Sequence, residues 1–136
     1  MKTFTKYDAA GMVVSKGRAE NPQESIPEGG GVFEGAEFDG DEFYFLDHVP
    51  TRRPAPPAIE FSAAEVIADG ETTIAMTGVP LGAKVIFGGG EIVAGGGAID
   101  LDTDLIGANR VIVEAFPAKR WIGTFNAVAA VNAPAP

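Results

Sequence analysis

Apolar and polar positions alternate in short runs along most of the chain, and the clearest series lies between Phe61 and Ala130. These runs are rich in β-branched residues and are separated by Asp-Gly, Gly-Gly-Gly and Gly-Ala-Asn segments. Such a pattern is typical of β-strands joined by tight turns. Glu60–Ile67 and Glu71–Thr77 flank Gly70, which can supply the positive φ of a hairpin turn, so we expect them to pair. No segment has a convincing amphipathic helical period.

The C-terminal part of the chain therefore predicts an all-β fold, an immunoglobulin-like β-sandwich over residues 55–132. Seven short strands separated by glycine-containing turns fit that architecture. Residues 133–136 are expected to form a disordered tail, because they follow the last expected strand and consist of Ala-Pro-Ala-Pro. The expected strands are Ile59–Ile67, Thr72–Thr77, Lys84–Phe87, Glu91–Val93, Ala98–Thr103, Arg110–Phe116 and Trp121–Val128.

Residues 1–54 predict β-hairpins and an extended arm in front of the sandwich. We expect a first hairpin in which Lys2–Tyr7 pairs with Gly11–Lys16. Gly17–Gly31 is polar and rich in glycine, so we expect a loop or an extended arm that a partner could order. Val32–Phe38 and Glu42–Leu46 are expected to be short strands around the Asp39-Gly40 turn dipeptide.

Five aromatic side chains lie close together in this N-terminal part. In Glu42–Leu46 the apolar side chains fall on both faces of the expected strand, which indicates burial on both sides or a subunit contact. Both interpretations stay open, and we expect a contribution to a subunit interface from Phe33, Phe38, Phe43, Tyr44 and Phe45.

Four prolines in the ten residues His48–Pro57 indicate an extended linker, and this segment is the best candidate for a domain boundary. A proline-rich ligand for a partner domain is the alternative.

Composition narrows the classes of function. The chain has 136 residues, a net charge of −9 and no cysteine. The acidic balance disfavours nucleic acid as a partner, and the absence of cysteine excludes disulfides and thiolate metal sites. No apolar run approaches the ~20 residues that span a bilayer, and the N-terminus lacks a signal peptide's apolar core. We expect a protein made in the cytoplasm, with no membrane partner.

One run of spaced carboxylates could hold a metal ion. Asp100, Asp102 and Asp104 resemble the start of a calcium-binding loop. However, the following glycine is Gly107 and the position of the closing glutamate holds Val111. The alternative is a strand with the three aspartates in solvent, so calcium is at most a weak expectation.

No set of residues predicts catalysis. His48 is the only histidine, and no serine lies in the sequence context of an activated nucleophile. The glycine runs lack the Gly-Lys-Ser/Thr of a phosphate-binding loop. Trp121 could stack on a sugar, but its strand spacing favours the core. We expect no catalytic residue and no cofactor.

The segment Tyr44–Ala130 resembles small accessory proteins of the tail modules of tailed bacteriophages, with a bacterial immunoglobulin-like C-terminal part. The resemblance lies in the proline-rich spacer, Ala68-Asp69-Gly70-Glu71-Thr72-Thr73, Gly78-Val79-Pro80-Leu81-Gly82-Ala83-Lys84-Val85 and Arg110–Pro117. It implies a non-enzymatic structural protein of the virion, tail- or tail-fibre-associated, that contacts other virion proteins and forms a homo-oligomer. The alternatives are a capsid decoration or cementing protein and a carbohydrate- or receptor-binding module.

Overall fold

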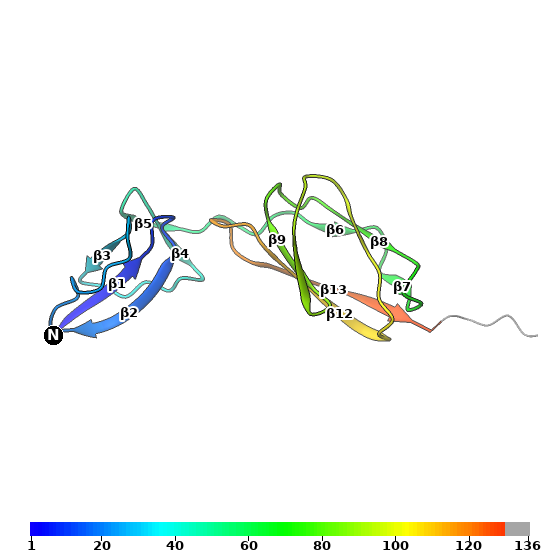
Figure 1. The fold of residues 1–136 in the computed structure, drawn as a ribbon, viewed down its shortest axis with the longest axis horizontal. Coiled ribbons are helices and arrows are strands. Elements are labelled where there is room, and N and C mark those ends of the chain that lie inside the picture. The colour runs from blue at the N-terminus through cyan, green and yellow to red at the C-terminus, as the bar shows by residue number, and fades with distance from the viewer. Residues whose placement is uncertain (130–136) are drawn as a thin grey trace, which may run out of the picture. The chain divides into compact units, whose positions relative to one another are not determined.

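The computed structural model describes residues 1–129, and its regular elements are all β-strands (Figure 1). The chain divides into two compact units, an N-terminal unit, Met1–Ala55, and a C-terminal unit, Pro56–Pro136. The division lies inside the proline-rich segment. The expected tail at 133–136 and the end of the expected sandwich at 130–132 lie outside the described residues.

The N-terminal unit contains a three-stranded antiparallel sheet and a separate hairpin. The sheet has the order β2-β1-β3, with β1 (Lys2–Tyr7) between β2 (Val13–Ala19) and β3 (Gly31–Glu34). The hairpin pairs β4 (Phe43–Leu46) with β5 (Val49–Arg52). Arg53 closes this unit by donating a hydrogen bond to the Gly40 carbonyl oxygen at 2.9 Å.

The hairpin corrects the expectation that an extended linker begins at His48. Asp47 and His48 adopt φ values of +49° and +64°, the left-handed conformation that a two-residue hairpin turn requires. Aspartate and histidine tolerate this region better than most residues. Pro50 lies opposite Phe45 in a two-stranded ribbon, where a missing N–H costs little because no strand within residues 1–129 pairs with the outer edge.

Gly17–Gly31 was expected to be a loop or an extended arm, and it folds back onto its own unit instead of extending from it. Its first residues continue β2 and its last residue begins β3. Between them Pro22 is buried, and the Lys6 ammonium donates a hydrogen bond to the Glu24 carbonyl oxygen. β2 and β3 pair with opposite edges of β1, and Ala19 lies beside Lys2 whereas Gly31 lies beside Tyr7, so the segment connects the two edges and the two ends of the sheet.

The C-terminal unit is a two-sheet β-sandwich, as the sequence predicted. One sheet has the order β10-β9-β12-β13-β7 and the other β11-β8-β6. The order of both sheets mixes distant segments, as in immunoglobulin-like topologies. The strands are β6 (Glu60–Phe61), β7 (Glu65–Ile67), β8 (Ile74–Thr77), β9 (Lys84–Phe87), β10 (Gly90–Val93), β11 (Ile99–Leu101), β12 (Gly107–Glu114) and β13 (Trp121–Val128).

The expected single strand Ile59–Ile67 is wrong, because the chain changes sheets at Ser62. β6 pairs antiparallel with β8, whereas β7 pairs parallel with β13 in the other sheet. At the change, Ser62 Oγ accepts a hydrogen bond from the Ala75 N–H at 2.9 Å. The side chain thus replaces a backbone acceptor that a continuous strand would have supplied. Consequently Glu60–Ile67 does not form a simple hairpin with the strand after Gly70.

The two sheets enclose an aliphatic core with few aromatic rings. Met76, Val111 and Val113 are fully buried, and Phe125 contacts the rings of Phe61 and Phe87. In β12 and β13, alternate residues point into this core, which fixes the opposite set on the outer face of the five-stranded sheet.

Candidate functional site

The outer face of the five-stranded sheet carries apolar side chains where a solvated face normally carries polar ones. Ile112 lies in the central strand β12, opposite Ile86 of β9 and Ile122 of β13. The three side chains form one row across three strands, which we call the isoleucine row. Ile86 and Ile112 are half-buried, and Ile122 is 50% exposed. Directly opposite residues on one face are near enough for contact, so the row is a continuous apolar strip.

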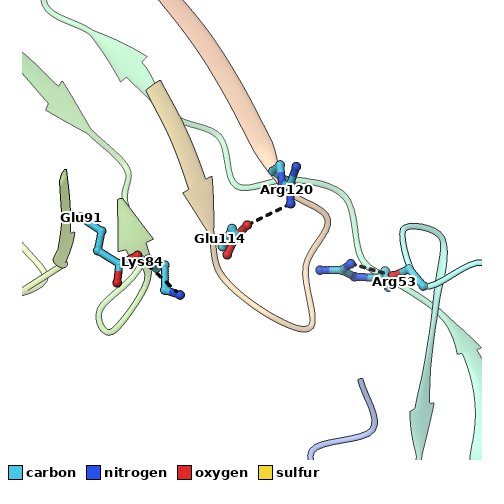
Figure 2. Close-up of polar contacts among 6 residues, drawn as sticks. Arg53, Lys84, Glu91, Glu114 and Arg120 are labelled. Carbon is cyan, nitrogen blue, oxygen red and sulfur yellow. Dashed lines mark hydrogen bonds and ion pairs between the residues drawn. The ribbon is translucent and has the colours of Figure 1, made fainter. Parts of the chain in front are cut away.

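A row of charged residues borders the isoleucine row on one side. Glu114 pairs in register with Lys84 across β12 and β9. The Glu114 carboxylate contacts the Arg120 guanidinium at 3.0 Å, and the Lys84 ammonium lies 3.7 Å from the Glu91 carboxylate (Figure 2). Exposed pairs of this kind contribute roughly 0–1 kcal/mol, so they add little stability. They leave the apolar strip bordered by charge, which is the usual anatomy of a protein interface.

The same face carries most of the basic side chains of the C-terminal unit. The basic residues of the C-terminal unit are Lys84, Arg110, Lys119 and Arg120. Lys84 and Arg110 point outward from β9 and β12, and Arg120 reaches Glu114 on that face. Lys119 lies in the connection between β12 and β13.

Carboxylates on this face offset that charge, whereas the rest of the unit is acidic. Glu65, Glu91 and Glu114 are the outward carboxylates of the five-stranded sheet. The remaining carboxylates have no basic neighbour in their own strands or loops. They are Glu60, Asp69, Glu71, Asp100, Asp102 and Asp104. The face around the isoleucine row is therefore close to neutral on a chain whose net charge is −9.

A shallow cleft of about 600 Å³ lies at one end of the sandwich. A buried pair shapes its wall, since Thr103 Oγ1 donates a hydrogen bond to Asn109 Oδ1 at 3.1 Å. The Asn109 amide donates in turn to the carbonyl oxygens of Leu105 and Gly107. These bonds use the polar groups of both side chains to hold the 102–107 loop. The polar side chains in the cleft wall therefore have a structural role, which is to hold this loop.

The spaced aspartates, which were a weak candidate for a calcium site, do not gather into a metal site. Asp100 points outward from β11, whereas Asp102 and Asp104 line the cleft. Among residues 1–129, no three histidine, cysteine, aspartate or glutamate side chains are placed so that they could hold a metal ion. β11 ends at Leu101, so Asp102 and Asp104 lie in the loop after the strand that holds Asp100.

The aromatic residues expected at a subunit interface lie in the core of the N-terminal unit. Tyr7 stacks on Phe45 with ring centroids 4.1 Å apart, and Phe38 packs edge-on against Phe33, Phe43 and Phe45. Tyr44 and Phe45 are buried, whereas Phe33, Phe38 and Phe43 keep intermediate exposure. The cluster is held within one chain, and a further role in subunit contact stays a prediction for the three partly exposed rings.

Tyr7 also links this cluster to the β4–β5 turn. Its hydroxyl lies 2.8 Å from Nδ1 of His48, and burial raises the pKa of Tyr7. His48 is exposed in its left-handed turn conformation. Its ring therefore helps fix the hairpin against β1, a structural role that the sequence did not indicate.

Trp121 points toward the interior of the sandwich. It is opposite the buried Val113 and packs edge-on against Phe61 at 5.7 Å between centroids. Its indole ring also covers Gly123, where a β-carbon would collide with it. Trp121 therefore packs against the core and keeps intermediate exposure.

Comparison with protein-family models, curated proteins and solved structures finds no match for this chain. In the part of the chain that the structure describes, no helix has the length and apolarity to cross a membrane.

The isoleucine row is the feature that sequence reasoning did not single out. The signal was present in β12, where Val111 and Val113 alternate with Ile112, so that both faces of the strand are apolar. Such a strand needs cover on both sides. The sandwich covers the inner side and leaves the outer side available.

Proposed function

We propose that this protein is a non-enzymatic structural component of a bacteriophage particle, located in the tail or at the tail-fibre attachment, and that it acts through protein–protein contacts. The observation that carries the contact function is the isoleucine row with its border of ion pairs. The assignment to a phage particle rests on the resemblance of Tyr44–Ala130 to tail-module accessory proteins.

Two further features support a contact function. The chain consists of two small β units joined within a proline-rich segment, and such a segment acts as a spacer between binding modules. The near-neutral face around the isoleucine row lets a neighbouring protein approach without the repulsion that the acidic remainder of the chain would cause. A binding surface built on strands is also held more rigidly than one built on loops.

Capsid decoration remains the second location, because a small β protein with an exposed sheet face serves there as well. The carbohydrate-binding alternative has less support, since Trp121, its stacking candidate, is partly buried and packs edge-on against Phe61.

The test is quantitative mass spectrometry of purified particles that are encoded by the same genome as this chain. We expect the protein at a small fraction of the copy number of the major capsid protein. A copy number comparable to that protein would instead assign it to capsid decoration. Absence from the particles would refute the virion proposal.

A matched pair of variants connects the test to the isoleucine row. Ile122→Lys places a charge on the 50% exposed row, and we expect it to reduce incorporation at least tenfold. Leu81→Lys is the control, because Leu81 is 77% exposed and lies in the loop between β8 and β9. Equal incorporation of both variants would show that the row is not the contact surface.

A further inference from the structure

The charges on β12 are arranged symmetrically about Ile112. Arg110 and Glu114 lie two residues before and two residues after Ile112, and all three side chains are on the outer face. The Ile112 side chain therefore stands midway between one cation and one anion. Among residues 1–129, Arg110 has no ion-pair partner, whereas Glu114 pairs with Arg120.

A two-fold axis that runs along the isoleucine row makes this face complementary to itself. Two sheets can pack face to face about 10 Å apart with their strands roughly aligned. Rotation about the row places Ile112 against Ile112 of the second copy and reverses the strand direction. Arg110 then faces Glu114 of the second copy, and Glu114 faces Arg110 of the second copy. Each such contact occurs twice, as a two-fold interface requires.

We propose that two copies of this chain associate through the outer faces of their five-stranded sheets, with the isoleucine rows in contact and with reciprocal Arg110–Glu114 pairs. The proposal rests on the contact function proposed above and names the partner of the same surface as a second copy of the chain.

The charge distribution favours a second copy over a basic or acidic partner at this surface. Two chains with a net charge of −9 repel each other over most of their surfaces. The outer sheet face has Lys84, Arg110 and Arg120 against Glu65, Glu91 and Glu114, so its charges cancel. A strongly charged partner would gain little attraction there, whereas a second copy of the same face can bring the cation Arg110 opposite the anion Glu114.

The first measurement is sedimentation equilibrium of the full chain from micromolar to millimolar concentration. We expect a concentration-dependent rise from the monomer mass of 14.1 kDa to twice that value. Ile112→Lys should weaken the dimer at least tenfold, because it buries an ammonium group in the centre of the contact. Leu81→Lys is the matched control and should dimerise like the unmodified chain.

Charge reversal tests the reciprocal pairing itself. Arg110→Glu places four carboxylates at the two contact points of its dimer, and Glu114→Arg places four guanidinium groups there. We expect each variant alone to sediment as a monomer. A mixture of the two should form a dimer, because both contacts then join a glutamate to an arginine. The fluorescence of Trp121 verifies that each variant is folded, since Glu114→Arg also removes the contact with Arg120.

A full chain that stays at 14.1 kDa at every concentration would overturn the proposal. So would a dimer that forms equally well with Ile112→Lys, or two charge variants that remain monomeric when mixed. These results leave the contact function standing if the protein is still found in particles. Conversely, a confirmed dimer that is absent from particles would refute only the virion assignment.

Discussion

The two faces of the five-stranded sheet have equally apolar central rows but differ in what covers them. On the inner face, Val113 lies between Val85 and Trp121, and the second sheet buries this row. On the outer face, Ile112 lies between Ile86 and Ile122, and residues 56–129 supply no second sheet. The two rows have similar composition. The row that the second sheet buries stabilises the fold, and the row that no sheet buries is available for binding.

This difference assigns separate roles to neighbouring residues. Burial of an apolar side chain contributes roughly 1.5–3 kcal/mol, and the inner row obtains this within one chain. The outer row can obtain it only when another molecule covers it. Single exposed apolar residues are normal on protein surfaces, but three in register on adjacent strands form a patch. Substitutions on the inner face should therefore lower stability more than association, and substitutions on the outer face should weaken association more than stability.

Truncation on β13 should give the largest contrast between the faces. Phe125 is buried and contacts Phe61 and Phe87, whereas Ile122 points outward. We expect Phe125→Ala to lower the free energy of unfolding by about 3–5 kcal/mol, because it leaves a large cavity. Ile122→Ala should cost less than about 1 kcal/mol at protein concentrations where the chain is a monomer.

Urea unfolding followed by the fluorescence of Trp121 measures both variants. Trp121 is the only tryptophan and lies in the C-terminal unit, so its signal reports that unit separately from the N-terminal one. Equal losses for Phe125→Ala and Ile122→Ala would show that the outer row is also covered within the chain.

Substitution by threonine at two adjacent positions of β12 gives a finer comparison. Val113→Thr keeps the volume but buries a hydroxyl group among apolar side chains, which costs about 1–3 kcal/mol. In residues 1–129, every buried side-chain polar atom has a hydrogen-bond partner, so this hydroxyl would be an exception. Ile112→Thr places its hydroxyl on the outer face and should change stability by no more than about 0.5 kcal/mol.

The same denaturation measurement compares the two threonine variants, and sedimentation adds the second half of the comparison. Ile112→Thr should weaken the proposed dimer while Val113→Thr leaves it unchanged under folding conditions. A reversal of these two effects would contradict the assignment of the faces.

Local pattern was sufficient to predict several strands and the all-β class. The expected boundaries of Lys2–Tyr7, Lys84–Phe87 and Trp121–Val128 coincide with β1, β9 and β13. In these strands, apolar side chains alternate and turn residues limit the run, so local sequence contains the required information.

Partner strands and sheet changes could not be predicted in this way. The separation of β6 from β7 follows from their pairing with different strands, β8 and β13, which lie later in the sequence. β5 contains Pro50, which is disfavoured in most strands and tolerated here only because the ribbon has two strands. The isoleucine row likewise depends on register, since Ile86, Ile112 and Ile122 become neighbours only after three strands pair.

The smallest expected effect lies outside both faces, in the loop between β7 and β8. The Asp69 carboxylate accepts hydrogen bonds from the N–H of Thr72 and the N–H of Glu71, and these bonds hold the pKa of Asp69 below its ordinary value of 3.8. Because the folded pKa is lowered, the carboxylate stabilises the fold above the unfolded pKa. This contribution is lost as the pH falls through the folded pKa.

Asp69→Asn tests this contribution, because the amide oxygen can still accept the backbone hydrogen bonds but does not titrate. We expect the stability advantage of the unmodified chain over Asp69→Asn to be present at neutral pH and to disappear below the ordinary aspartate pKa of 3.8. Melting temperatures across that pH range provide the measurement, with Asp100→Asn as the control on an exposed aspartate of β11. An advantage that stays constant down to the acid limit would show that the charge of Asp69 does not stabilise the turn, and that its hydrogen-bonding oxygen alone accounts for the loop.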